Sequence, residues 1–74
     1  MRDKIKNVMA VVLEIKPSEI PDSASTSTIE NWDSLNHMNL IVALEEEFKI
    51  RFNDDEIVKI VTLDELEKIL VSKM

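Results

Sequence analysis

The sequence predicts an all-α fold: a small four-helix bundle with three longer helices, one short third helix and a long first loop. Apolar residues recur at the three- and four-residue spacing of a helix face in several segments. No segment alternates apolar and polar residues as a strand would, and the chain has no glycine for tight hairpin turns. With 74 residues, 45% hydrophobic content and no cysteine, residues 1–74 are expected to form a single domain that is stabilised by apolar packing.

The first predicted helix runs from Arg2 to Ile15. Four of its apolar residues fall on one helix face: Ile5, Val8, Met9 and Val12. Pro17 follows, and because proline cannot continue a helix, the helix is expected to end before it.

A long loop, "KPSEIPDSASTSTIENW", follows over residues 16–32 and contains two prolines and a run of serine and threonine. Loops of this length are uncommon in small domains without a packing or functional reason, so Ile20 and Ile29 are expected to anchor it to the core. Trp32 directly precedes the next helix, where an apolar side chain commonly fixes how the chain enters, and is predicted to be a packing residue.

The second predicted helix runs from Ser34 to Phe48, with Asp33 as its N-cap. Its apolar residues form a broad face: Leu35, Met38, Ile41, Val42, Leu44 and Phe48. This helix is therefore expected to supply much of the core.

Two further helices are predicted after residue 52. Asn53 or Asp54 caps a short third helix with acids in its first turn, where the helix dipole favours negative charge. Thr62 and Glu65 have the spacing of a capping box and begin a fourth helix. The apolar residues of these two helices are Ile57, Ile60, Val61, Leu66, Ile69 and Leu70.

The net charge of −6 restricts the possible partners. A phosphate backbone would repel such a surface, so nucleic acid is excluded, whereas basic patches on other proteins would attract it. No apolar run approaches the roughly 20 residues of a membrane span, and the N-terminal residues mix charges with apolar positions, unlike a secretory signal. We expect a cytoplasmic monomer.

Residue inventory also excludes several chemistries. Nucleotide-binding loops and EF-hand loops need glycine, which the chain lacks, and the acids at residues 54–56 are better explained as dipole partners than as metal ligands. A hydrolase would need Ser34 as nucleophile and His37 as base, three residues apart on one helix face. The sequence offers such a hydrolase no third residue to orient the imidazole, and it offers no oxyanion site. His37 is therefore expected to be a half-exposed surface residue.

The tripeptide "DSL" at residues 33–35, followed by "LIVALEEEF" at residues 40–48 and an acid-rich short helix, resembles the acyl carrier proteins. The resemblance covers nearly the whole chain. It implies a non-catalytic carrier with 4′-phosphopantetheine attached covalently to Ser34 from coenzyme A, and thioester-bound acyl intermediates on that arm. A hydroxyl at a helix N-terminus suits this role because the resulting phosphate lies at the positive end of the helix dipole.

The same resemblance implies that the second helix is the docking surface for partner enzymes. The expected partners are a phosphopantetheinyl transferase and a synthase, ligase, ketosynthase or acyltransferase that carries a basic patch. The docking residues expected from it are Asp33, Leu35, Asn36, Met38, Asn39, Glu45 and Glu46. Asn36 and Asn39 depart from the pattern, because carriers of primary fatty-acid synthesis commonly have acids there, and this departure suggests a discrete carrier for a specialised pathway.

Two alternative functions remain open on the sequence. Aminoacyl and peptidyl carriers share the fold and the attachment serine, and an unmodified acidic helical adaptor would need only the docking surface. For a carrier, the adaptable Met, Leu, Ile and Val stripes lead us to expect that the bundle can part to shelter an acyl chain beside the second helix.

Overall fold

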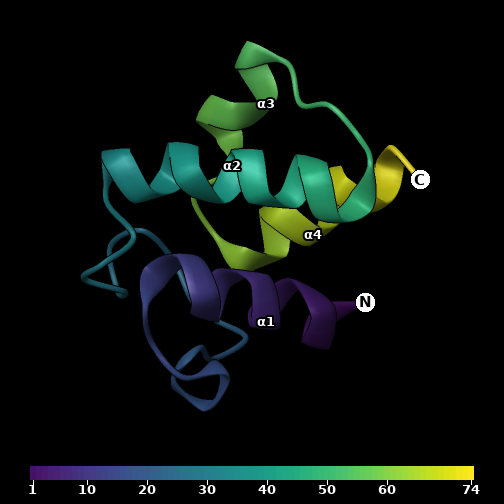
Figure 1. Ribbon diagram of the computed structural model, residues 1–74. Helices are drawn as coiled ribbons and strands as arrows, with labels where there is room; N and C mark the ends of the chain where they lie inside the picture. Colours follow the sequence, from purple (N-terminus) through teal and green to yellow (C-terminus); the bar gives the residue numbers. More distant parts are fainter.

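A computed structural model describes residues 1–74 and contains helices without strands, which confirms the predicted all-α class (Figure 1). The elements are α1 (Arg2–Leu13), a 3₁₀ turn (Pro17–Glu19), α2 (Ser34–Phe48), α3 (Asp54–Lys59) and α4 (Leu63–Ser72). In Figure 1, α1 and α2 lie side by side in opposite directions, and α3 lies on the other side of α2 from α1. None of these helices combines the length and the apolar character needed to cross a membrane.

Helix α1 ends two residues earlier than predicted. Glu14 adopts a left-handed conformation with φ 57°, and its backbone N–H donates to the Ala10 carbonyl. The Ile15 amide donates to the same carbonyl, at 3.1 Å, so these two bonds satisfy the helix end before the chain reaches Pro17. The predicted boundary at Ile15 was wrong because this residue lies past the C-cap.

The other helix ends follow the predicted caps. The Asp33 carboxylate accepts from an amide in the first turn of α2, and the Asn53 side chain does so in α3, where Glu56 completes a capping box. Thr62 Oγ1 accepts from the Glu65 amide at the start of α4, at 3.1 Å. These bonds satisfy amide donors that a helix leaves free at its N-terminus.

The core contains only apolar side chains, drawn from α1, α2, α4 and the loops. Helix α2 contributes Leu40, Ile41 and Leu44. Its predicted apolar face was too broad, however, because Leu35, Met38 and Val42 are exposed by 73%, 48% and 51%. Helix α3 contains no fully buried residue.

The long first loop is ordered by packing and by one strand-like contact. Ile20 and Ile29 are buried, as predicted, and so is Trp32. Ser25 forms an isolated antiparallel bridge with Thr62, next to the bond from the Leu63 amide to the Ala24 carbonyl. The loop is thereby held against the start of α4.

Arg2 connects the N-terminus of α1 to α4. Its guanidinium donates to Glu67 at 2.8 Å and to Asp64 at 2.9 Å. These bonds raise the pKa of Arg2, and the hydrogen bond from Arg2 lowers the pKa of Glu67. These ion pairs link α1 to α4 at the surface of the bundle.

Candidate functional site

Ser34 is the first residue of α2 and its side chain is exposed to solvent. Asp33 directly before it has an extended backbone, and the Asp33 carboxylate Oδ1 accepts from the Asn36 amide at 2.9 Å. The cap satisfies one amide of the first turn, and a group placed on Ser34 would meet the positive end of a 15-residue helix. The local sequence therefore both begins the helix and displays the hydroxyl.

Two asparagines fasten this helix start to the rest of the bundle. Asn36 Nδ2 donates to the Asn31 carbonyl at 2.8 Å, and Asn31 Nδ2 donates to the Leu13 carbonyl at 2.9 Å. The chain of bonds runs from the end of α1 through the loop to the first turn of α2. Asn36 is thus a structural residue as well as a predicted docking residue, a role that no sequence pattern indicated.

His37 bridges α2 to its neighbours through both ring nitrogens. The Trp32 indole Nε1–H donates to His37 Nδ1 at 3.0 Å, which assigns the imidazole proton to Nε2. Nε2 lies 2.8 Å from the Ile57 carbonyl oxygen in α3 and donates to it. His37 is half-exposed, as predicted, but the sequence did not indicate its bonds, whose partners are a tryptophan five residues away and a backbone carbonyl twenty residues away.

This bonding also removes the hydrolase alternative. A general base must offer a free nitrogen to the nucleophile, and neither nitrogen of His37 is free for Ser34. The imidazole is oriented, but by contacts that hold two helices together.

A groove of about 560 Å³ opens beside Ser34, between the start of α2 and α3. Its lining is mostly apolar and includes three exposed apolar residues, Val58 at 75%, Met38 at 48% and Val61 at 44%. The remaining lining residues are Thr26, Trp32, Asp33, Ser34, His37, Ile57 and Ile60. The sequence analysis did not name Val58. The available signal was a valine within the short acidic helix.

The predicted docking residues do not all have free side chains. Asp33, Leu35, Met38, Asn39 and Glu46 are exposed. Asn36 is half-buried in the bonds described above, and Glu45 is half-buried with its carboxylate accepting from the Phe52 amide at 2.9 Å. The exposed members run along one surface of α2 from Asp33 to Glu46.

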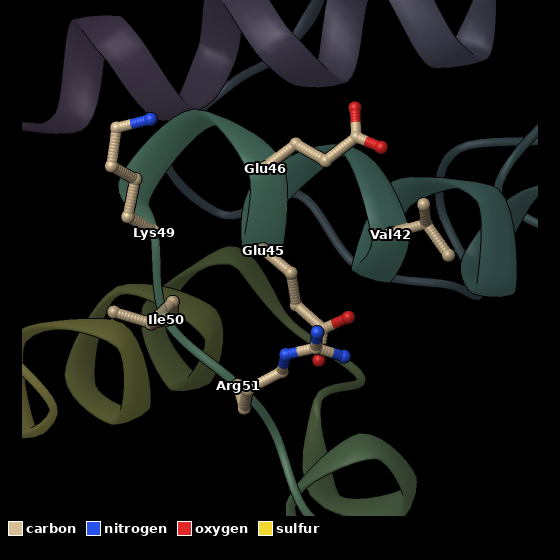
Figure 2. Close-up of a pocket in the computed structure, with 6 residues that line it drawn as sticks. All are labelled: Val42, Glu45, Glu46, Lys49, Ile50 and Arg51. Carbon is tan, nitrogen blue, oxygen red and sulfur yellow. The ribbon is translucent and has the colours of Figure 1, made fainter.

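The C-terminal end of this surface also carries positive charge. Figure 2 shows a hollow lined by Val42, Glu45, Glu46, Lys49, Ile50 and Arg51, in which the Arg51 and Glu45 side chains point toward one another. Lys49 and Arg51 are exposed. The acids of α2 are Glu45, Glu46 and Glu47, and Lys49 and Arg51 bring opposite charge next to them in this hollow.

Comparison with known proteins agrees with this geometry. The family described as "Phosphopantetheine attachment site" matches residues 3–70. An acyl carrier protein of Thermosynechococcus vestitus is 33% identical over 72 residues, which cover 97% of this chain and 89% of that protein.

Among solved structures, the solution NMR structure of a holo acyl carrier protein from Geobacter metallireducens superposes with a TM-score of 0.86 at 32% identity. The match covers 97% of this chain and 83% of that one. With the family match over most of the chain, the shared four-helix fold and the exposed serine at the head of α2, this chain belongs to the acyl carrier protein family and is a non-catalytic, phosphopantetheine-dependent carrier.

Proposed function

We propose that Ser34 is the attachment residue for 4′-phosphopantetheine in this carrier. The observation that carries the proposal is its place at the first position of α2, exposed and directly after an N-cap that leaves the serine hydroxyl unobstructed. When bound, the group supplies a terminal thiol on which an acyl unit is held as a thioester.

The residues around Ser34 fit such a group. A phosphodiester on its hydroxyl would lie at the positive end of α2, close to the free amides of the first turn. The groove beside it is open and mostly apolar, and its volume falls in the range of small-molecule sites. With no cysteine in the chain, the thiol of the arm would be the only one present.

We further propose that the exposed surface of α2 docks the enzymes that load and use the carrier. Leu35 and Met38 are apolar side chains in solvent next to the attachment position, and Asp33 and Glu46 supply charge at either end. An apolar centre with charged flanks suits a partner with a basic patch around an apolar contact. Partners of this kind include a phosphopantetheinyl transferase and an acyl-transferring synthase, ligase or ketosynthase.

The attachment residue is tested by intact mass. The apo protein is incubated with coenzyme A and a phosphopantetheinyl transferase, and a single phosphopantetheine adduct is expected. Ser34→Ala is expected to abolish the adduct, while the matched control Ser27→Ala, another exposed serine, retains it. An adduct that persists in Ser34→Ala would refute the assignment, and no adduct on the wild type would favour the unmodified adaptor.

The docking surface is tested by removing one charge at a time. Glu46→Gln should slow loading by the transferase at low salt, because rim charges act mainly on encounter rate. Asp3→Asn removes the same charge from α1, which lies on the opposite side of α2 from α3, and is expected to have little effect (Figure 1). Equal effects of the two variants would show that net charge alone attracts the enzyme.

A further inference from the structure

The chain places two exposed cations directly after α2, although the carrier is acidic overall, with a net charge of −6. Lys49 is the C-cap of α2 and Arg51 follows two residues later, and both side chains are exposed. Other cations, among them Arg2, Lys6 and Lys73, lie in ion pairs with acids of the chain. Lys49 and Arg51 form no such pair. Their charge therefore faces whatever approaches this end of α2 from solvent.

The hollow that contains these cations continues the exposed apolar stripe of α2. Leu35, Met38 and Val42 are exposed by 73%, 48% and 51%, and their spacing of three and four residues places them along one side of the helix. Val42 also lines the hollow. From Ser34 to Lys49 the helix rises about 22 Å. A protein interface of standard size, about 800 Å² per partner, is wide enough to cover both ends.

The charges along this surface follow a fixed order. Asp33 lies before the apolar stripe, Glu46 lies after it, and the two cations come last. A partner patch made only of cations would suit Asp33 and Glu46 but would meet Lys49 and Arg51 with like charge. Because like charges that face each other suppress wrong partners and wrong registers, the order of charges selects among docking faces.

Two exposed cations can also attract a small anion or an anionic membrane, but the surroundings disfavour both. Figure 2 shows the Lys49 and Arg51 side chains extending in different directions, so they do not converge on one small anion. An anionic bilayer would also meet the acids Glu45, Glu46 and Glu47 of the last turn of α2. A protein surface can place an acid opposite the cations and a cation opposite the glutamates, so a protein fits this order best.

We propose that Lys49 and Arg51 determine partner specificity by requiring an acidic side chain on the docking face of the partner enzyme, opposite the C-terminal end of α2. The same two cations repel enzymes whose docking patch is basic throughout. They also fix the direction in which a partner lies along the helix. The inference rests on the proposed docking of partner enzymes on α2.

The test variant is Lys49→Asn combined with Arg51→Glu. Asparagine tolerates the left-handed backbone of residue 49, at φ 55°, so the end of α2 is kept. The matched control, Lys16→Asn with Lys68→Glu, changes the net charge by the same amount at exposed positions on the loop after α1 and on α4. Arg51→Gln alone lies beyond the helix end, and it carries the test if the double variant does not fold.

The first probe is an acyltransferase of primary fatty-acid synthesis with a basic docking patch, acting on carriers loaded on Ser34. The test variant should raise its kcat/KM by about 2- to 30-fold at low salt, the combined effect of two exposed charges. The gain should fall as salt rises, and the control should stay near the wild-type value. The single variant Arg51→Gln should gain about 1.4- to 5-fold.

The second probe is the same enzyme with each lysine or arginine of its docking patch replaced in turn by glutamate. At least one replacement is expected to raise kcat/KM on the wild-type carrier and to lower it on the test variant. This crossed pattern would place an acid opposite Lys49 and Arg51, which a general effect of net charge would not do.

The proposal is overturned if the test variant gains no more than the control, if the gain is independent of salt, or if no replaced enzyme prefers the wild-type carrier. Binding of the wild type, but not of the test variant, to vesicles of anionic phospholipid would assign the cations to a membrane and would also overturn it. When Glu46→Gln slows loading but the cation variants change nothing, only the charge order is refuted. When Glu46→Gln has no effect either, docking on α2 itself fails.

Discussion

Adding a negative charge to α2 should separate two roles of its asparagines, one structural and one in partner choice. Asn39 is exposed, and its side chain makes one long hydrogen bond, from Nδ2 to Asn36 Oδ1 at 3.4 Å. Asn39→Glu is therefore expected to leave stability within about 0.5 kcal/mol of the wild type. Asn36→Asp should cost about 0.5–1.5 kcal/mol, because a carboxylate cannot donate to the Asn31 carbonyl as the amide does at 2.8 Å.

The functional effect of Asn39→Glu follows from the value of an exposed ion pair. If an enzyme of primary fatty-acid synthesis presents a cation at this position, the new pair contributes about 0.2–1 kcal/mol, or about 1.4- to 5-fold in kcat/KM at low salt. The gain should disappear as salt shortens the screening length to about 3 Å at 1 M. Use by the carrier's own partners should fall, since an amide that contacts a less basic surface is lost.

The assay measures kcat/KM of a primary-pathway acyltransferase across a salt series, with urea unfolding of each variant alongside. Asn7→Glu adds the same charge on α1 and serves as the matched control. The reasoning is refuted if the wild type already equals a primary carrier, if the gain is independent of salt, or if Asn7→Glu gains as much. An Asn36→Asp variant as stable as the wild type would remove the structural role of that amide.

Two predictions concern the stability of the bundle. Leu44→Ala truncates a side chain with no exposure in the centre of α2 and should destabilise the fold by about 2–5 kcal/mol in urea unfolding; a loss below about 1 kcal/mol would mean that the core collapses around the site. The pKa values of Glu56 and Glu67 are lowered from 4.5, chiefly by hydrogen bonds from Lys73 and Arg2, so the stability that these pairs contribute is present above about pH 4.5 and is lost as the pH falls further. Lys73→Met should therefore lower the urea midpoint at about pH 7 and flatten its decline below about pH 4.5, and an unchanged decline would show that the pair with Glu56 contributes nothing.

The features that the sequence predicted correctly depend on neighbours along the chain. Asp33 and Asn53 cap their helices because the amides that they satisfy lie three residues ahead, within reach of a side chain whatever the rest of the fold does. The exposed position of Ser34 follows from the same local rule. Trp32 was predicted to be buried because an apolar residue before an N-cap packs against the helix that it precedes.

The features that only the tertiary structure decided depend on distant partners. The carbonyl of Ile57 that His37 reaches, and the Asn31 carbonyl that Asn36 reaches, carry no signature in the sequence because every residue has a carbonyl. Helical periodicity likewise placed Met38 on the apolar face of α2. Periodicity does not determine how much of that face the other helices cover, and Met38 remains exposed. Since α3 is only six residues long, part of that face stays open to solvent in the groove beside Ser34.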